Sequence, residues 1–186
     1  MVVPTLETDR LVLRGVTLED VSAIQRHFNN YDVVRQLASV VPWPYPHDGA
    51  EQFVKSLSFQ QGFTRWVWGI YLKPQIVDLI GVIDLRITAV GENRGFWLAQ
   101  PFWGQGLMTE AVTVVTNCAF TILGFDKLIL ANAVGNLRSR RIKEKEGARF
   151  LYIEPAGFVD PSISEHEIWE LTKHDWALAR RHIVKK

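Results

Sequence analysis

The feature that most constrains the fold is an apolar strand that passes through a glycine-rich turn into a long helix and then into a second apolar strand. Residues 93–99 (NRGFWLA) predict the first strand, and residues 127–133 (KLILANA) predict the second. Between them, apolar side chains at helical spacing predict one helix that runs to about Leu123 and ends at Gly124. Such a βαβ unit requires parallel strands joined by a right-handed crossover.

The rest of the chain alternates strands and helices. Further strands are expected at 9–16, 65–72, 76–87, 148–154 and 165–172, and further helices at 17–29, 48–61, 136–146 and 174–183. Three prolines in residues 41–46 (VPWPYP) predict a stiff loop. This order indicates an α/β fold with a mixed sheet, and 186 residues of which 47% are hydrophobic suit a single domain, 1–186.

Charge and cysteine content narrow the class of protein. A net charge of +1 gives no reason to expect nucleic acid as a partner. The single Cys118 forms no internal disulfide, no apolar run approaches the roughly 20 residues of a membrane span, and the first ten residues do not resemble a signal peptide. We therefore expect a cytoplasmic protein with no membrane association and no bound metal.

The glycine-rich turn, Gly104-Gln105-Gly106, precedes a helix that has no Ser, Thr, Asp or Asn at its start. The first N–H groups of that helix therefore need another acceptor, and an anion suits the positive end of the helix dipole. The alternative is a tight turn whose amides face water. A dinucleotide fingerprint would need glycine at Thr109, and a P-loop would need Gly-Lys-Ser/Thr, so neither motif is present.

Residues 103–111 (WGQGLMTEA) and residues 136–147 (NLRSRRIKEKEG) form two motifs that together resemble the ribosomal-protein alanine N-acetyltransferase branch of the GNAT superfamily. Residues 103–111 (WGQGLMTEA) are similar to its acetyl-CoA-binding motif, and residues 136–147 (NLRSRRIKEKEG) to its Asn-x-x-Ser-x-Arg-x-x-Glu-Lys-x-Gly segment. The opening TLETDRLVLR and the closing WELTKHDW resemble the same branch. The resemblance implies a single-domain GNAT fold, with a mostly antiparallel sheet of about seven strands flanked by helices. It places acetyl-CoA where the fourth and fifth strands splay apart.

The resemblance also implies which residues bind acetyl-CoA. Backbone amides of the turn would hold the pyrophosphate, the strand before it would hydrogen-bond the pantetheine, and the helix after 136 would reach the sulfur end. The residues so implied are Trp97, Leu98, Ala99, Trp103, Gly104, Gln105, Gly106, Leu107, Met108, Thr109, Asn136 and Ser139. Three residues depart from the family pattern: Met108 replaces Gly or Ala, Pro101 is displaced by one place, and Ala148 replaces Phe.

The catalytic groups are less well defined. An oxyanion needs N–H donors, which the resemblance assigns to Leu98, and the acceptor amine must lose a proton. The family's usual glutamate and tyrosine positions hold Ala131 and Lys143, so neither role can be carried over. Glu92 is our first candidate for a base acting through water, or else an exposed turn carboxylate. Ser139 is the candidate at the sulfur end of the cofactor.

Other chemically capable residues have ordinary structural interpretations. Asp84 in an apolar strand is a second candidate carboxylate, or a partner of Arg86. The basic stretch Arg138, Arg140, Arg141, Lys143 and Lys145 either meets the cofactor's 3′-phosphate or forms a solvated face. We expect His47 and His166 to lie on the surface. We expect Cys118 and at least one of Trp66 and Trp68 to lie in the core. Trp43 and Tyr45 could line the acceptor site.

The sequence thus predicts an N-acetyltransferase that moves acetyl from acetyl-CoA to a primary amine. An α-amine of pKa about 7.8 is roughly 14% neutral at pH 7 and a lysine about 0.04%, which favours a protein N-terminus or a small amine as acceptor. The alternatives are a non-catalytic acyl-CoA-binding or sensing module, and a phosphate-binding domain for another nucleotide. Both a monomer and a homodimer stay open.

Overall fold

The predicted strands form one mixed sheet in the computed structural model, which describes residues 2–57, 60–74, 78–89 and 91–183. The strand order is β1-β2-β3-β4-β5-β6-β8-β7, and every neighbouring pair is antiparallel except β5 and β6. The strands are β1 (Leu6–Glu7), β2 (Leu11–Gly15), β3 (Arg65–Leu72), β4 (Leu79–Arg86), β5 (Arg94–Leu98), β6 (Lys127–Ala133), β7 (Arg149–Pro155) and β8 (Glu165–Thr172). The α/β class and the mixed sheet are confirmed; the eighth strand is β1, a two-residue strand too short to leave a pattern in the sequence.

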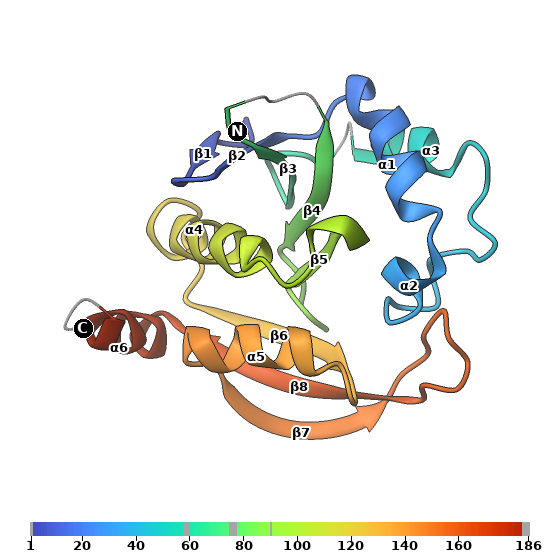
Figure 1. The fold of residues 1–186 in the computed structure, drawn as a ribbon. Coiled ribbons are helices and arrows are strands. Elements are labelled where there is room, and N and C mark those ends of the chain that lie inside the picture. The colour runs from blue at the N-terminus through green and yellow to red at the C-terminus, as the bar shows by residue number, and fades with distance from the viewer. Residues whose placement is uncertain (1, 58–59, 75–77, 90, 184–186) are drawn as a thin grey trace.

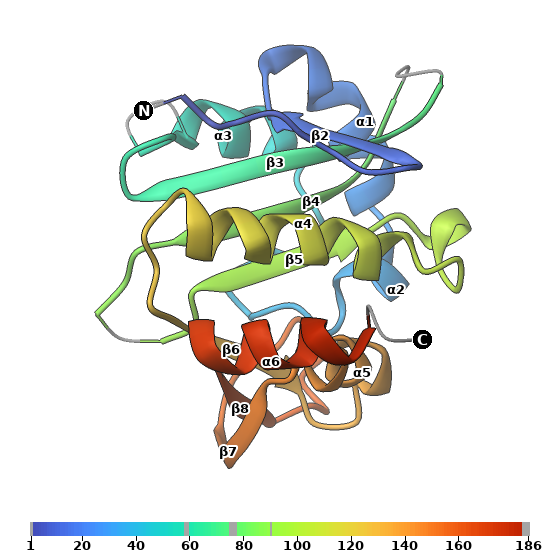
Figure 2. The ribbon, with the colours of Figure 1, turned by 90° about the vertical axis from the view of Figure 1, so that its left-hand side faces the viewer.

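Helices cover both faces of the sheet. They are α1 (Val21–Phe28), α2 (Tyr31–Val34), α3 (Gly49–Ser56), α4 (Leu107–Thr121), α5 (Leu137–Glu146) and α6 (Lys173–Ile183). Helices α4 and α6 lie in front of the strands in Figure 2, whereas α1, α2 and α3 lie on the opposite side, as Figure 1 also shows. The helix expected over 48–61 ends at Ser56, with residues 58 and 59 outside the description; the expected start of the third strand at 76 and 77 lies outside it as well.

Each face of the sheet has its own apolar core. The face under α4 buries Leu107, Ala111 and Val115 against strand residues such as Trp68 and Ile83. The face under α1 and α3 buries a separate set of side chains: Ala23, Ile24, Phe28, Ala50, Val54, Val67 and Tyr71. Removing so much apolar surface from water is the main stabilising term for the fold. The sheet is thereby held rigidly between two helical layers.

The parallel junction of β5 and β6 is short, and this opens the sheet. The register records one paired position, Arg94 with Leu130, next to two hydrogen bonds of 2.7 Å that join Asn93 to the backbone of Ile129. Beyond Arg94 the two strands have no recorded pairing, and the amino-terminal ends of α4 and α5 lie beside the gap (Figure 1). The expected βαβ unit is confirmed, and its loose end positions the candidate site.

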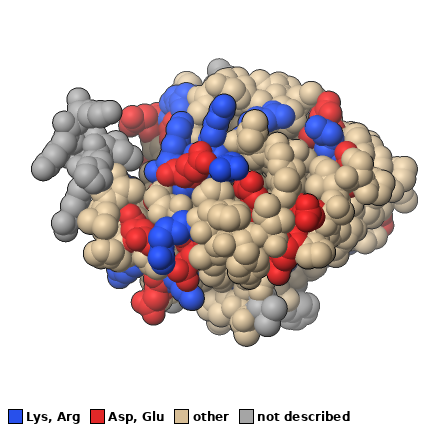
Figure 3. Space-filling view, turned by 90° about the horizontal axis from the view of Figure 1, so that it is seen from below, with Lys and Arg blue, Asp and Glu red and all other residues tan. Residues whose placement is uncertain are grey.

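The surface fits the near-neutral composition. On the face seen from the side of β7, acidic and basic side chains are intermixed over several elements (Figure 3). Within the described ranges no helix is both long and apolar enough to cross a bilayer.

Candidate functional site

The glycine-rich turn exposes a row of backbone donors. Helix α4 begins at Leu107 without a side-chain cap, and Gly104 and Gly106 adopt left-handed φ values of 76° and 75°. In the part of the chain that the structure describes, the N–H groups of residues 104–109 have no protein acceptor. The expectation for Trp103 is wrong for its backbone, because its N–H already donates to Gln100 O at 3.1 Å. The turn therefore offers six free amides rather than seven.

An arginine immediately before β2 holds this turn in shape. The Arg10 guanidinium donates to Gln105 O at 3.0 Å and pairs with the Glu110 carboxylate at 2.6 Å. Thr8 Oγ1 also donates to that carboxylate. Partial burial raises the pKa of Glu110, but the hydrogen bonds from Thr8 and Arg10 outweigh it and lower the pKa, so Glu110 stays charged. With the carbonyl of Gln105 held outward, the amides of the turn face the gap.

Substituting Arg10→Ala should weaken acetyl-CoA binding about tenfold, because the turn loses the contact that fixes its orientation. The pair is half exposed, so the free energy of unfolding should fall by less than about 1 kcal/mol. Calorimetric titration with acetyl-CoA measures the effect. Lys73→Ala is the matched control, since Lys73 pairs with Glu7 at the same corner and does not contact the turn. Equal affinities in the two variants would contradict the role given to Arg10.

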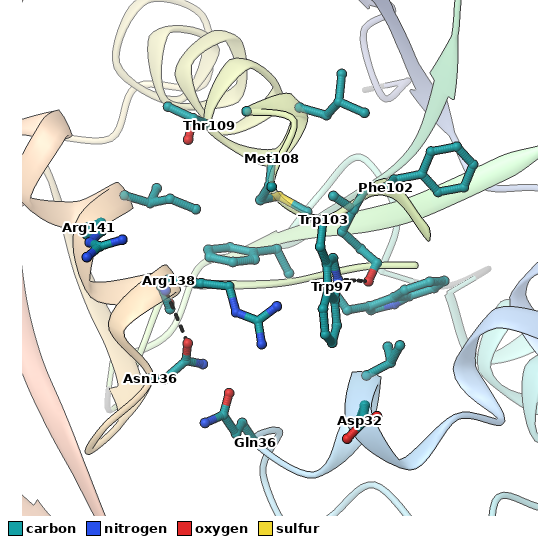
Figure 4. A pocket seen from close by; sticks show the side chains of 18 of the residues that line it. Asp32, Gln36, Trp97, Phe102, Trp103, Met108, Thr109, Asn136, Arg138 and Arg141 are labelled. Carbon is teal, nitrogen blue, oxygen red and sulfur yellow. Dashed lines mark hydrogen bonds between the residues drawn. The ribbon is translucent and has the colours of Figure 1, made fainter. Parts of the chain in front are cut away.

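Strand β5 lines the gap with Phe96, Trp97 and Leu98. Ala99 N–H donates to Ile80 O at 2.8 Å, and since strand residues alternate in direction, the backbone of Leu98 points to the opposite side, toward β6. Leu98 O accepts a 2.7 Å hydrogen bond from Trp103 Nε1, so the backbone group of Leu98 that stays available is its N–H. The backbones of Trp97 and Ala99 face β4, whereas the Trp97 side chain lines the cavity (Figure 4). The Leu98 N–H therefore remains the predicted donor to the oxyanion.

Helix α5 supplies the opposite wall. Asn136 caps it, with Oδ1 accepting from Ser139 N at 3.1 Å, and Ser139 lines the gap from the first turn. The Arg138 guanidinium lies over the Trp103 indole, 4.0 Å from the ring centroid, and so bridges α5 and the turn before α4. Figure 4 shows Arg138 reaching across the cavity toward Trp103.

These elements enclose a cavity of about 270 Å³. Three cations line it, Arg138, Arg141 and Lys145, and none of them forms an ion pair with a carboxylate of the described residues. Together with the free amides they make this wall suited to phosphates. Asp32 of helix α2 and Gln36, in the turn after that helix, close the other side (Figure 4), and Asp32 is the one carboxylate among the described residues of the lining.

Glu92 is not positioned to act as the base. It lies before the amino-terminal end of β5, pairs with Arg86 at 3.3 Å, and does not line the cavity. It lies six positions before Leu98, a span of roughly 20 Å in an extended chain. Asp84 is an ion-pair partner, as the alternative prediction had it. Arg65 donates two hydrogen bonds to its carboxylate, and Arg86 lies 3.5 Å away. Neither carboxylate reaches the site.

The view of α5 as a solvated basic face needs correction. Lys143 is 1% exposed and Glu146 4%, since both lie on the inner face of the helix with Ser139 and Ile142. Glu146 forms a buried two-point ion pair with Arg94 of β5, with distances of 2.8 and 2.6 Å. Burial, aided by Arg94, lowers the pKa of Lys143 to about 7.

The remaining candidates lie outside the cavity. His47 is exposed, and His166 pairs with Glu154. Cys118 is buried in the core, and burial raises the pKa of its thiol to about 11, which makes it unreactive. Trp66 and Trp68 are both core residues. Trp43 packs against Tyr31 at a tilt of 48° and Tyr45 packs against Phe28, and neither Trp43 nor Tyr45 lines the cavity.

Sequence reasoning missed Asp32, Gln36 and the contact between Arg10 and Glu110. Helix α2 has only four residues, and tertiary packing brings it to the cavity, so no pattern announces it. Arg10 and Glu110 are 100 residues apart, and neither has a local signature. The buried Lys143 had a usable signal, because Ser139, Ile142, Lys143 and Glu146 recur at i, i+3, i+4 and i+7.

Comparisons with known proteins agree with this geometry. A family model described as "Acetyltransferase (GNAT) domain" matches residues 10–149. N-acetyltransferase YoaA of Bacillus subtilis is 29% identical over 77% of this chain and 82% of its own length. The [ribosomal protein uS5]-alanine N-acetyltransferase of Escherichia coli is 27% identical over 94% of each chain. A structure of Mycobacterium smegmatis RimJ with CoA-disulfide superposes with a TM-score of 0.79 at 16% identity, over 94% of this chain and 88% of that one.

Proposed function

The chain belongs to the GNAT family of N-acetyltransferases, and from that premise we propose that it transfers acetyl from acetyl-CoA to an α-amino group, of a protein N-terminus or of a small amine. The observation that carries the proposal is the row of six free amides at residues 104–109, five of which belong to residues that line the same cavity as Arg138, Arg141 and Lys145. A pyrophosphate and a 3′-phosphate need such donors. The proposal includes a cytoplasmic location, where ribosomal proteins and acetyl-CoA occur together.

The acceptor class follows from the acid–base chemistry of the cavity. Asp32, the carboxylate of the described lining, is exposed and accepts a hydrogen bond from Gln100 at 3.2 Å. An amine with a low pKa needs the least help, which favours α-amines over lysine side chains. The Escherichia coli relative is named for an alanine of ribosomal protein uS5. Alanine has no side-chain amine, so that name agrees with an α-amine acceptor.

In this proposal some residues of the cavity bind the cofactor and others take part in acetyl transfer. Bound acetyl-CoA supplies an activated thioester carbonyl. The amides of Gly104 to Thr109 would hold the pyrophosphate, and Arg138, Arg141 and Lys145 the remaining phosphate charge. The Leu98 N–H, directed into the gap, would donate to the carbonyl oxygen as negative charge develops there. Ser139 would hold a proton at Oγ beside the sulfur, and Asp32 would attract the acceptor's ammonium group before it is deprotonated.

Substituting Asp32→Asn should raise KM for a cationic amine about fivefold and leave KM for acetyl-CoA unchanged, because an exposed carboxylate contributes up to about 1 kcal/mol to such an attraction. Steady-state kinetics with each substrate varied in turn measures both constants. Asp126→Asn, an exposed carboxylate outside the cavity, is the matched control. A rise in KM for acetyl-CoA instead would place Asp32 on the cofactor side.

Two measurements test the proposed function. Acetyl-CoA at about 100 times its dissociation constant should stabilise the protein by about 2.7 kcal/mol in thermal unfolding, whereas NAD should not. Turnover is then measured on peptides with a free N-terminus, on lysine peptides with a blocked N-terminus, and on small amines. Activity on lysine peptides alone would overturn the α-amine assignment. Binding without turnover on any amine would favour an acyl-CoA-binding or sensing module.

A further inference from the structure

A lysine lies directly behind the serine that lines the cavity. Lys143 Nζ donates a 2.9 Å hydrogen bond to Ser139 Oγ, one helical turn earlier on α5. That is the one hydrogen bond of this amine among the described residues, and its nearest ring, Phe96, is 5.9 Å away. An ammonium group can donate three hydrogen bonds, so the charged form of this buried amine is poorly satisfied. Burial therefore favours the neutral form of the Lys143 amine over its ammonium form.

The charged groups that act on Lys143 lie on three elements, β5, α5 and β8. Arg94 of β5 lies close enough to disfavour the ammonium form, while Glu146 of α5 and Glu167 of β8 favour it. Glu146 does not need Lys143 as a counter-ion, because Arg94 and Thr116 already donate to its two oxygens. Glu167 accepts from several groups, including Arg140 at 3.3 Å. A structural ion pair therefore does not account for Lys143.

We propose that Lys143 is a positioning residue that acts through Ser139, resupplying the serine hydroxyl with the proton that it gives to the departing sulfur. The inference rests on the proposed function. Its geometric basis is the chain of atoms from the buried amine to Ser139 Oγ and from there to the cavity. The burial of Lys143, which keeps other acceptors away, directs its proton to Ser139.

The protons and electrons balance over one turnover. As the carbon–sulfur bond breaks, its electron pair goes to sulfur, and Ser139 Oγ–H transfers its proton there. Lys143 Nζ–H transfers a proton to Ser139 Oγ and becomes neutral. The acceptor nitrogen loses one proton to solvent as the amide bond forms. Lys143 regains a proton from solvent through Ser139 once the cavity is empty, so no oxidant or further reactant is needed.

The pH dependence of the rate gives the first test. Since Lys143 acts in its protonated form, kcat should fall as the pH rises through about 7, the pKa to which burial lowers this amine. The variant Lys143→Met, of similar length and apolar, should lose that descending limb and about tenfold in kcat. Lys173→Met, an exposed lysine at the start of α6, is the control and should keep the limb. A descending limb unchanged in Lys143→Met would overturn the proposal.

A double-mutant comparison tests whether the two residues act in series. If Lys143 acts only through Ser139, adding Lys143→Met to Ser139→Ala should cost nothing further in kcat. Independent roles predict that the two losses multiply, and this outcome would overturn the proposal.

A binding measurement without turnover gives a readout besides activity. The probe is CoA itself, whose thiolate absorbs near 240 nm. Lys143 donates to Ser139 Oγ and so leaves the serine O–H free to donate to the sulfur, which stabilises the thiolate. The pH midpoint for bound CoA should therefore rise by about one unit in Lys143→Met and in Ser139→Ala. An unchanged midpoint in Ser139→Ala overturns the relay even if Lys143→Met does not fold. A wild-type protein that fails to bind CoA would instead refute the proposed function.

Discussion

Substituting Gly104→Val should abolish most of the acetyl-CoA binding. Gly104 has a φ of 76°, and an added Cβ meets no atom within 4 Å, so the side chain itself has room but projects beside the row of amides. A β-branched residue rarely adopts this φ, so the turn must rearrange or bear strain. Two lost hydrogen bonds to a charged group correspond to about 3 kcal/mol, or roughly a 100-fold rise in Kd.

Gly124→Val separates this loss of binding from backbone strain. Gly124 follows α4 at its other end, with a φ of 77° and again no atom within 4 Å of an added Cβ. Both variants should therefore lose a similar free energy of unfolding, about 1–3 kcal/mol. Only Gly104→Val should lose the thermal stabilisation by acetyl-CoA. If Gly124→Val lost it equally, the effect would come from general destabilisation, and the amides would have no special role.

The same turn shows how far the sequence predicts the site. Two glycines and a helix without a cap predict that backbone donors lie at the start of α4, because the consequence is local. Neither hydrogen bond of Trp103 was predicted in this way. Its backbone N–H donates to Gln100 O, and its indole N–H donates to Leu98 O. Both contacts depend on how the residues 100–102 fold back, which no spacing records. Local geometry was predictable, and side-chain contacts between segments were not.

The fold, too, was predictable from the sequence only in part. The hairpin of β3 and β4 and the parallel pair β5 and β6 follow from alternation and from the crossover rule. The insertion of β8 between β6 and β7 does not, because it joins residues some 40 apart. Glu92 was misjudged for the same reason, since its nearness to β5 in the sequence says nothing about which end of the strand carries the chemistry. The gap lies at the far end.

The largest effect on stability is expected at Arg94. Its guanidinium is 1% exposed and binds Glu146, itself 4% exposed, in addition to Thr116 Oγ1 at 2.8 Å. Arg94→Met leaves the Glu146 carboxylate buried without its main partner, which should cost about 3–5 kcal/mol. For a chain of this length that is a fall in Tm of about 10 °C. Arg26→Met is the control, because the Arg26–Asp78 pair is half exposed and should contribute less than about 1 kcal/mol.

Removing both charges should restore much of what Arg94→Met loses. When one partner of a buried ion pair is removed, most of the lost stability is the cost of leaving the other charge buried without a partner. The double variant Arg94→Met with Glu146→Leu should therefore be more stable than Arg94→Met alone. Thr116 then keeps a hydroxyl without its carboxylate partner, and this limits the recovery. Chemical denaturation of the four proteins gives the coupling free energy. A double variant less stable than Arg94→Met would mean that Glu146 stabilises the fold through another partner, and Lys143, one turn away on the same face of α5, would be the first to test.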